Sequence, residues 1–151
     1  MTGPDRLPPR ALVDTGVVLR AFGSYPDEAH SAACRAFVEA MLAAQHELLI
    51  AAPTIAEILR GDARPVPRIE GVVVVPFDDE AAVWIGTRLP MPALKKLAEP
   101  GLTSTHLKYD ALIVGCAGRQ DVDCIVSLDR GIHKLASHVG LVCLWPAEAV
   151  L

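Results

Sequence analysis

The chain has 151 residues, of which 52% are hydrophobic, 21% charged and 5% aromatic, and its formal net charge is −4 at pH 7. This length and composition predict one folded domain and exclude an intrinsically disordered chain. The negative charge argues against a protein that binds nucleic acid through a broadly basic surface. It would still fit nucleic-acid chemistry if the acids gather in one site that binds cations.

The cysteines and the apolar segments indicate the compartment. No two cysteines form a C-x-x-C pair and each lies in an apolar segment, so we expect buried, reduced thiols rather than disulfides or a zinc site. No apolar run reaches the roughly 18 residues that a membrane-spanning helix needs. The first ten residues carry charges and prolines and lack the apolar core of a secretory signal. We therefore expect a cytoplasmic protein.

Strand and helix patterns alternate along the chain, after a proline-rich lead-in at residues 1–10 that we expect to be flexible. Short apolar runs predict strands at residues 11–14, 48–51, 72–75, 124–128 and 141–145. Helices are predicted at residues 17–22, 26–44, 54–60 (ended by Gly61), 78–89, 93–98, 104–118 (capped by Ser104 or Thr105) and 130–138 (ended by Gly140), with a loop at 62–71. This alternation predicts a single α/β domain over residues 11–151, with a doubly wound parallel sheet and helices on both faces.

Four carboxylates stand where this layout least expects charge. Asp14 and Asp129 end the first and fourth strands, Glu57 lies in an apolar helix after the second strand, and Asp110 lies in a buried helix before the fourth. The carboxyl ends of parallel strands form one edge of the sheet, where ligands bind. We therefore expect the four acids to converge at that edge.

Each acid also has an ordinary structural interpretation. Asp14 and Asp129 could cap the helices that follow them, and Glu57 could be a solvated helix residue. Asp110 is the hardest to explain in this way, because its helix neighbours Leu107, Ile113 and Val114 are all apolar and charged groups are rarely buried without a partner.

Four clustered carboxylates need a counter-charge. Two unit charges about 4 Å apart repel by about 4 kcal/mol at an effective dielectric constant near 20. Oxygen ligands of this kind suit Mg²⁺ or Mn²⁺. Two such ions about 3.5–4 Å apart can activate a water and stabilise the leaving oxygen in phosphodiester cleavage. The acids therefore indicate a metal-dependent phosphodiesterase.

Four segments in order, LVDT, TIAEILRG, KYDALIVGCA and VSLDRGI, resemble the PIN domain, and most closely its small VapC-like members, the toxins of bacterial toxin–antitoxin pairs. The resemblance extends from about Ala11 to Trp145. It implies a three-layer α/β/α fold with a central parallel five-stranded sheet of order 3-2-1-4-5. The family often has Asn where this chain has Gly16, and the stretch between Gly61 and Val72 is shorter than in VapC-like proteins.

The resemblance also implies function. It implies an endoribonuclease that uses one or two Mg²⁺ or Mn²⁺ ions, held by Asp14, Glu57, Asp110 and Asp129, to cleave RNA with a metal-activated water. The implied partners are a small antitoxin protein and a second copy of the chain. One alternative is a non-cleaving RNA- or protein-binding module with a PIN-like fold. Another is a phosphoacceptor signalling domain, which would need a paired acid cluster on the first strand, where this chain has one acid.

Further polar residues are candidates for supporting roles. Thr15 and Ser127 could hold carboxylates or waters by hydrogen bonds, or be ordinary strand-end hydroxyls. His106 precedes Asp110 by one helical turn, but the histidines show no metal-ligand spacing and we expect it to be a bystander. The candidate RNA contacts, each of which could instead be a solvated surface charge, are Arg20, Arg60, Lys108, Arg130 and Lys134.

Overall fold

The computed structural model describes residues 7–23, 28–62 and 68–150. At its centre lies a five-stranded, all-parallel sheet with the strand order β3-β2-β1-β4-β5. The predicted fold class and strand order are thus confirmed. The strands are β1 (Arg10–Val13), β2 (Glu47–Ala51), β3 (Val72–Val75), β4 (Cys124–Val126) and β5 (Cys143–Leu144).

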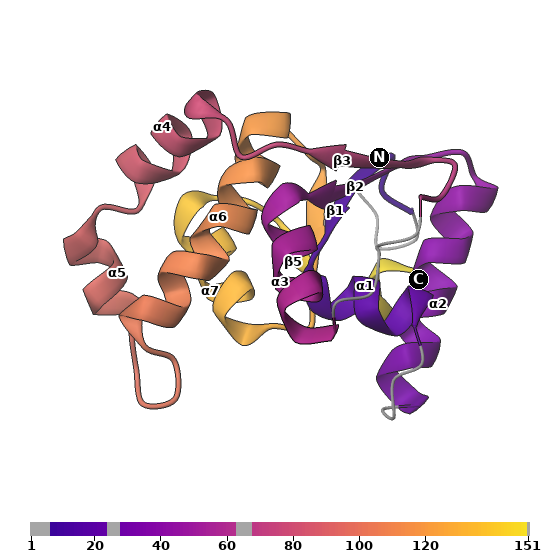
Figure 1. The fold of residues 1–151 in the computed structure, drawn as a ribbon, viewed down its shortest axis with the longest axis horizontal. Helices are drawn as coiled ribbons and strands as arrows, with labels where there is room; N and C mark the ends of the chain where they lie inside the picture. The colour runs from indigo at the N-terminus through magenta and orange to yellow at the C-terminus, as the bar shows by residue number, and fades with distance from the viewer. Residues whose placement is uncertain (1–6, 24–27, 63–67, 151) are drawn as a thin grey trace.

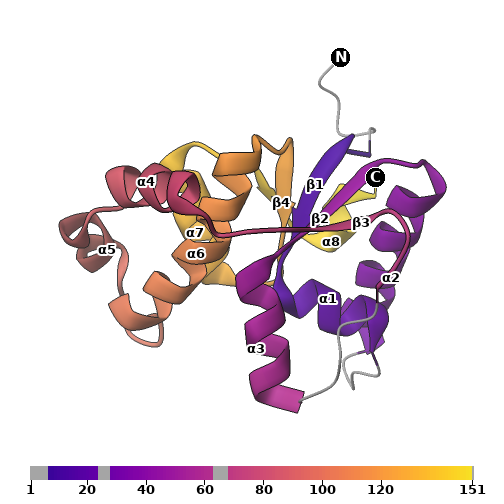
Figure 2. The same ribbon diagram turned by 45° about the horizontal axis from the view of Figure 1, so that its top comes forward.

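Helices connect the strands and cover both faces of the sheet (Figure 1). They are α1 (Thr15–Phe22), α2 (Glu28–Ala43), α3 (Ala52–Asp62), α4 (Asp79–Arg88), α5 (Met91–Leu97), α6 (Ser104–Gln120), α7 (Arg130–Val139) and α8 (Pro146–Ala149). Figure 2 shows α1, α2 and α8 on one side of the sheet and α4 to α7 on the other. Helix α3 contacts α1, α6 and β2. It therefore bridges the two helical layers.

The central strand β1 shows why this sequence forms a sandwiched sheet. Successive side chains of a strand point to opposite faces. Ala11 and Val13 belong to the buried cluster that includes Val17, Phe37 and Ala149 from α1, α2 and α8. The run of apolar residues without alternating polar ones reflects burial on both faces, as expected of a parallel sheet.

The other face of the sheet carries the larger apolar cluster. Leu12 and Leu49 lie in it with Ile85, Ile113 and Ile132 from α4, α6 and α7. Since α6 packs against both α4 and α7, it is buried along most of its length. This burial fixes the position of Asp110, which α6 carries.

Several helix ends differ from prediction. Helix α3 continues through Gly61 to Asp62, and glycine in a helix merely costs stability where no left-handed turn follows. Helix α6 is capped by Thr103, one residue before the predicted caps, and continues to Gln120. Gly140 adopts the left-handed conformation with φ of 80° and ends α7 as predicted.

The ends of the chain also differ from the layout predicted. Strand β5 is shorter than predicted, and α8 follows it as a helix that the sequence patterns did not indicate. Of the predicted lead-in, residues 1–6 lie outside the described residues, and Arg10 already belongs to β1. Residues 63–67 of the predicted loop also lie outside the described part.

The four cysteines are free thiols. Cys34, Cys116 and Cys124 are buried and Cys143 is half-buried, in keeping with their positions in apolar segments. Within the described residues, no helix combines the length and apolar character required to cross a membrane.

Candidate active site

The site lies at the carboxyl edge of the sheet, where β1 and β4 run side by side. Asp14 follows β1 directly, and its backbone N–H donates to the carbonyl of Val126 at the end of β4. Asp129 lies three residues beyond Val126. The pairing of the two strands therefore brings these distant acids to one edge, as the sequence predicts.

Both acids are helix caps as well as members of the site. Asp14 Oδ1 accepts from the backbone N–H of Val17 over 3.1 Å. Asp129 Oδ1 accepts from Gly131 over 2.7 Å and from Ile132 over 3.3 Å. Since the caps use one oxygen of each carboxylate, the Oδ2 atoms are left for other partners. The capping interpretation and the site interpretation are thus compatible.

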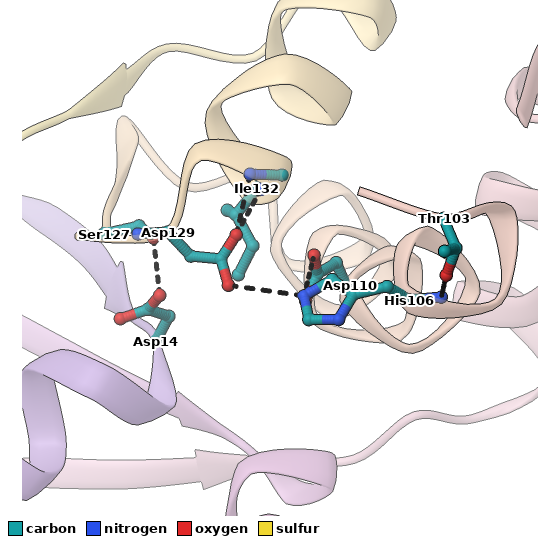
Figure 3. Close-up of polar contacts among 8 residues, drawn as sticks. Asp14, Thr103, His106, Asp110, Ser127, Asp129 and Ile132 are labelled. Atoms are coloured by element: carbon teal, nitrogen blue, oxygen red, sulfur yellow. Dashed lines mark hydrogen bonds and ion pairs between the residues drawn. The ribbon is translucent and has the colours of Figure 1, made fainter. Parts of the chain in front are cut away.

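Ser127 joins the two acids (Figure 3). Its hydroxyl donates to Asp14 Oδ2 and accepts from the backbone N–H of Asp129 over 2.9 Å. Ser127 is fully buried, and its hydrogen bond to Asp14 is shielded from water. It fixes the relative position of the two carboxylates.

Asp110 and Glu57 complete the acidic group from the two helices α6 and α3. Asp110 is 8% exposed, and its Oδ2 atom is buried without a hydrogen-bond partner among the described residues. Glu57 is exposed on α3. With Asp14 and Asp129 they line one open cleft of about 300 Å³. The structure therefore brings all four predicted acids together.

Burial and mutual repulsion raise the pKa values of Asp110 and Asp14. Burial raises the pKa of Asp110 to about 8, and the charges of Asp129, Glu57 and Asp14 add to the effect. Burial likewise raises the pKa of Asp14 to about 6, although hydrogen bonds from Ser127 and Val17 oppose the shift.

The pKa of Glu57 is also raised by burial, while a hydrogen bond from Thr15 and the charge of Arg60 lower it. Clustered carboxylates whose pKa values are raised by burial and by one another are typical of functional sites. The hydroxyls of Thr15 and Thr54 also lie within hydrogen-bond distance, 3.3 Å apart. Thr15 thus supports the rim of the cleft on the side of α3.

The cleft fits a divalent cation. Its donors are carboxylate oxygens, the ligands that Mg²⁺ and Mn²⁺ prefer, and the buried Oδ2 of Asp110 lacks a protein partner in the described part of the chain. Gly131 keeps the space beside it open, because a Cβ there would lie 2.5 Å from Asp110 Oδ2 and 3.0 Å from Asp129 Oδ1. The residues present therefore suit the binding of a hard cation.

His106 belongs to the site, although the sequence prediction treated this residue as a bystander. Its Nε2 atom lies 3.6 Å from Asp110 Oδ2 and 3.9 Å from Asp129 Oδ2 (Figure 3). One ligand atom from each of the three residues lies within 4.8 Å of the others. The i, i+4 spacing to Asp110 was visible in the sequence, whereas the proximity to Asp129 arises only from the packing of α6 against α7.

The candidate RNA contacts divide into two groups. Arg20 lines the cleft and also donates to the Gly16 carbonyl over 3.1 Å, while Arg60 and Lys108 are exposed on α3 and α6. Arg130 and Lys134 lie on α7.

These last two cations share one acidic partner. Both form ion pairs with Glu99, with N···O distances of 2.6 and 3.2 Å. No local pattern predicts this pairing, because Glu99 is more than 30 residues away along the chain.

A sequence model of the PIN domain family matches residues 11–137. The chain belongs to the PIN domain family. PIN domains are in general metal-dependent nucleases, which agrees with a cleft lined by acids. No curated protein matches this chain in sequence.

Among solved structures, this PIN domain is similar to FitAcB from Neisseria gonorrhoeae, with a TM-score of 0.58 and 16% sequence identity. The similarity covers 90% of this chain and 97% of that chain. At this identity the likeness supports the fold. The assignment of roles to residues therefore depends on the geometry of the cleft.

Proposed function

We propose that this PIN domain is an endoribonuclease of the VapC-like toxin type, which depends on one or two Mg²⁺ or Mn²⁺ ions. Asp14, Glu57, Asp110 and Asp129 would hold the cation. The observation that carries the proposal is the buried Asp110 carboxylate, which faces the other acids in an open cleft and has an oxygen without a partner among the described residues. Such an arrangement costs stability unless a cation compensates it.

The residues of the chain have distinct roles in this proposal. A bound divalent cation supplies positive charge that stabilises the phosphate transition state and acidifies water. Ser127 orients Asp14 and the backbone of Asp129. Helices α1 and α7 both begin at the cleft, directly after Asp14 and Asp129. The partial positive charge at their N-termini favours the ionised carboxylates and the binding of a phosphate.

For RNA, we favour Arg20, Arg60 and Lys108 as contacts to the phosphate backbone. Arg20 lines the cleft, and the other two are exposed on the helices that border it. Arg130 and Lys134 would have to exchange Glu99 for a phosphate. Arg130 is exposed and Lys134 is half-buried, and ion pairs at the surface are weak enough for such an exchange.

The resemblance to VapC-like toxins leads us to propose two protein partners. One is a small antitoxin that covers the acidic edge and blocks cleavage, and the other is a second copy of the chain. The structural similarity to FitAcB is compatible with a toxin fold. Both partners can be tested by co-purification and by measuring the mass of the complex in solution.

The test of the proposed activity is cleavage of a mixed RNA pool by the full chain, with Mn²⁺ or with EDTA. Asp110→Asn removes the charge at nearly constant size. Asp123→Asn is a matched control, since Asp123 is an exposed acid that accepts from the backbone of Arg10 at the opposite edge of the sheet. We expect cleavage by wild type and Asp123→Asn with Mn²⁺, and none with EDTA or Asp110→Asn.

Other results would contradict the proposal. Equal cleavage by wild type and Asp110→Asn would indicate a contaminating nuclease. If Mn²⁺ raises the melting temperature of neither protein and no RNA is cut, the cation site is wrong. A non-cleaving binding module would then be the better interpretation.

A further inference from the structure

His106 lies in the first turn of α6, and its imidazole points toward the carboxylates of Asp110 and Asp129 (Figure 3). Its side chain is 56% exposed, whereas that of Asp110, one turn further along the helix, is 12% exposed. The Thr103 hydroxyl accepts from the backbone N–H of His106 over 3.2 Å and so fixes this turn of the helix. The imidazole is therefore held beside the buried carboxylate and is accessible from solvent.

The distances place Nε2 within reach of a shared ion. Ligand-to-metal bonds are about 2.0–2.2 Å long, so one ion can bridge two atoms that lie up to about 4 Å apart. The separations of Nε2 from Asp110 Oδ2 and Asp129 Oδ2 are 3.6 and 3.9 Å. Both are too long for hydrogen bonds. The three groups thus surround a space of the size that a cation occupies.

We infer that His106 supplies a nitrogen ligand to the cation, which makes this site prefer Mn²⁺ to Mg²⁺. The inference rests on the proposed metal-dependent function and adds to it the identity of the ion. Mg²⁺ binds oxygen ligands and retains its waters, whereas imidazole favours transition-metal ions. A site made only of carboxylates would lack this basis for discrimination.

The buried oxygen of Asp110 is a separate observation that points to the same ion. It has no hydrogen-bond partner among the described residues, and Gly131 provides the space beside it. If His106 served only as a charge partner of the acids, a direct hydrogen bond to Asp110 would satisfy this atom. The observed separation of 3.6 Å leaves it unsatisfied.

The test measures metal binding by the full chain without RNA. Mn²⁺ affinity is determined from the electron paramagnetic resonance signal of the free ion, and Mg²⁺ affinity by competition. Electron spin echo modulation then reports whether a nitrogen is bonded to Mn²⁺. The variants are His106→Asn, Asp110→Asn and His138→Asn, the last a control because His138 is exposed at the far end of α7.

We expect wild type and His138→Asn to bind Mn²⁺ more tightly than Mg²⁺ and to show nitrogen modulation. His106→Asn should lose the modulation and bind Mn²⁺ about tenfold more weakly, while its Mg²⁺ affinity changes by less than about threefold. Asp110→Asn should weaken the binding of both Mn²⁺ and Mg²⁺.

The results that would overturn the inference differ in whether they also overturn the proposed carboxylate site. Tight Mn²⁺ binding without nitrogen modulation, or an unchanged preference in His106→Asn, would remove His106 from the ligand set and leave the carboxylate site intact. Failure of wild type to bind either ion would overturn the proposed function together with the inference.

Discussion

Acids lie at both ends of the parallel strands, but in opposite circumstances. At the amino-terminal end, Arg10 donates from its side chain to Glu47 over 2.7 Å and from its backbone to Asp123 over 2.9 Å. At the carboxyl end, Asp14 and Asp110 face other carboxylates, and burial raises their pKa values. The first pair of acids is matched by one arginine, whereas in the second pair burial and neighbouring carboxylates outweigh the hydrogen bonds that Asp14 accepts.

This difference separates acids that stabilise the fold from acids to which we assign a function. A paired, exposed carboxylate contributes little or somewhat favourably to stability. A buried carboxylate without a cation opposes folding. The sign of the stability change on neutralising each acid should therefore distinguish the two ends of the sheet. Each of the following predictions tests that contrast.

The largest effect is expected for Asp110→Asn on RNA cleavage. Loss of the charge removes a proposed ligand from the least solvated part of the site. We expect the cleavage rate to fall by more than about 100-fold, equivalent to about 2.7 kcal/mol in the activation barrier. The measurement is the initial rate on one defined RNA with saturating Mn²⁺. Activity within about threefold of wild type would contradict the assignment.

The second prediction concerns stability against pH in EDTA. The pKa of Asp110 is raised to about 8 and that of Asp14 to about 6, from an ordinary 3.8. Between these values the folded protein holds protons that the unfolded chain has lost, so the free energy of unfolding falls as the pH rises. The favourable contribution is complete below about pH 4 and is lost as the pH passes 6 and then 8.

Urea unfolding at pH 5 and pH 8 checks this slope. Allowing for solvent screening, we expect wild type to lose about 2 kcal/mol over this range. Asp110→Asn should lose less, and at pH 8 it should be more stable than wild type. A wild-type stability that rises toward pH 8 would show that the carboxylates are not held in their protonated state.

Much of this site was predictable because local patterns carried it. Asp14 and Asp129 each follow an apolar strand, and Asp110 lies among apolar helix positions. The strand order then brings them together, since β1 pairs with β4. These acids could be found because burial is encoded in the neighbouring residues of the sequence.

Other features depend on contacts between distant segments and left no local pattern. His106 reaches Asp129 only because α6 packs against α7. The ion pairs of Arg130 and Lys134 with Glu99 form because the segment that follows α5, which contains Glu99, lies beside α7 in the fold. Gly61 gave a misleading stop signal, since a glycine inside a helix costs stability without by itself ending the helix.

Ser127→Ala tests the link between Asp14 and Asp129. The substitution leaves the partly buried N–H of Asp129 without its acceptor and removes a hydrogen bond that lowers the pKa of Asp14. We expect a loss of about 1–2 kcal/mol in the free energy of unfolding. We also expect Mn²⁺ binding to require a higher pH, because Asp14 would hold its proton more strongly. Ser127→Thr, which keeps the hydroxyl, should retain the wild-type pH profile if the extra methyl group is accommodated.

Gly131→Ala tests whether open space beside the acids matters. The new Cβ would lie 2.5 Å from Asp110 Oδ2, so the carboxylate must move. We expect about a tenfold loss of Mn²⁺ affinity and of cleavage. Gly86→Ala is the matched control, because a Cβ there meets no atom within 4 Å and should stabilise α4 by up to about 1 kcal/mol. Equal Mn²⁺ affinity in the two variants would contradict a role for this space.

The smallest effect is expected at the amino-terminal end, for Glu47→Gln. The side chains of Arg10 and Glu47 are 29% and 45% exposed, so their ion pair is screened by water and salt. Arg10 also keeps its bonds to Asp123 and Gln120. We expect a destabilisation below about 1 kcal/mol that shrinks with added salt, and unchanged cleavage. Because Asp110→Asn should raise stability at pH 8 while removing cleavage, a stabilisation by Glu47→Gln, or a loss of cleavage, would erase the contrast between the two ends of the sheet.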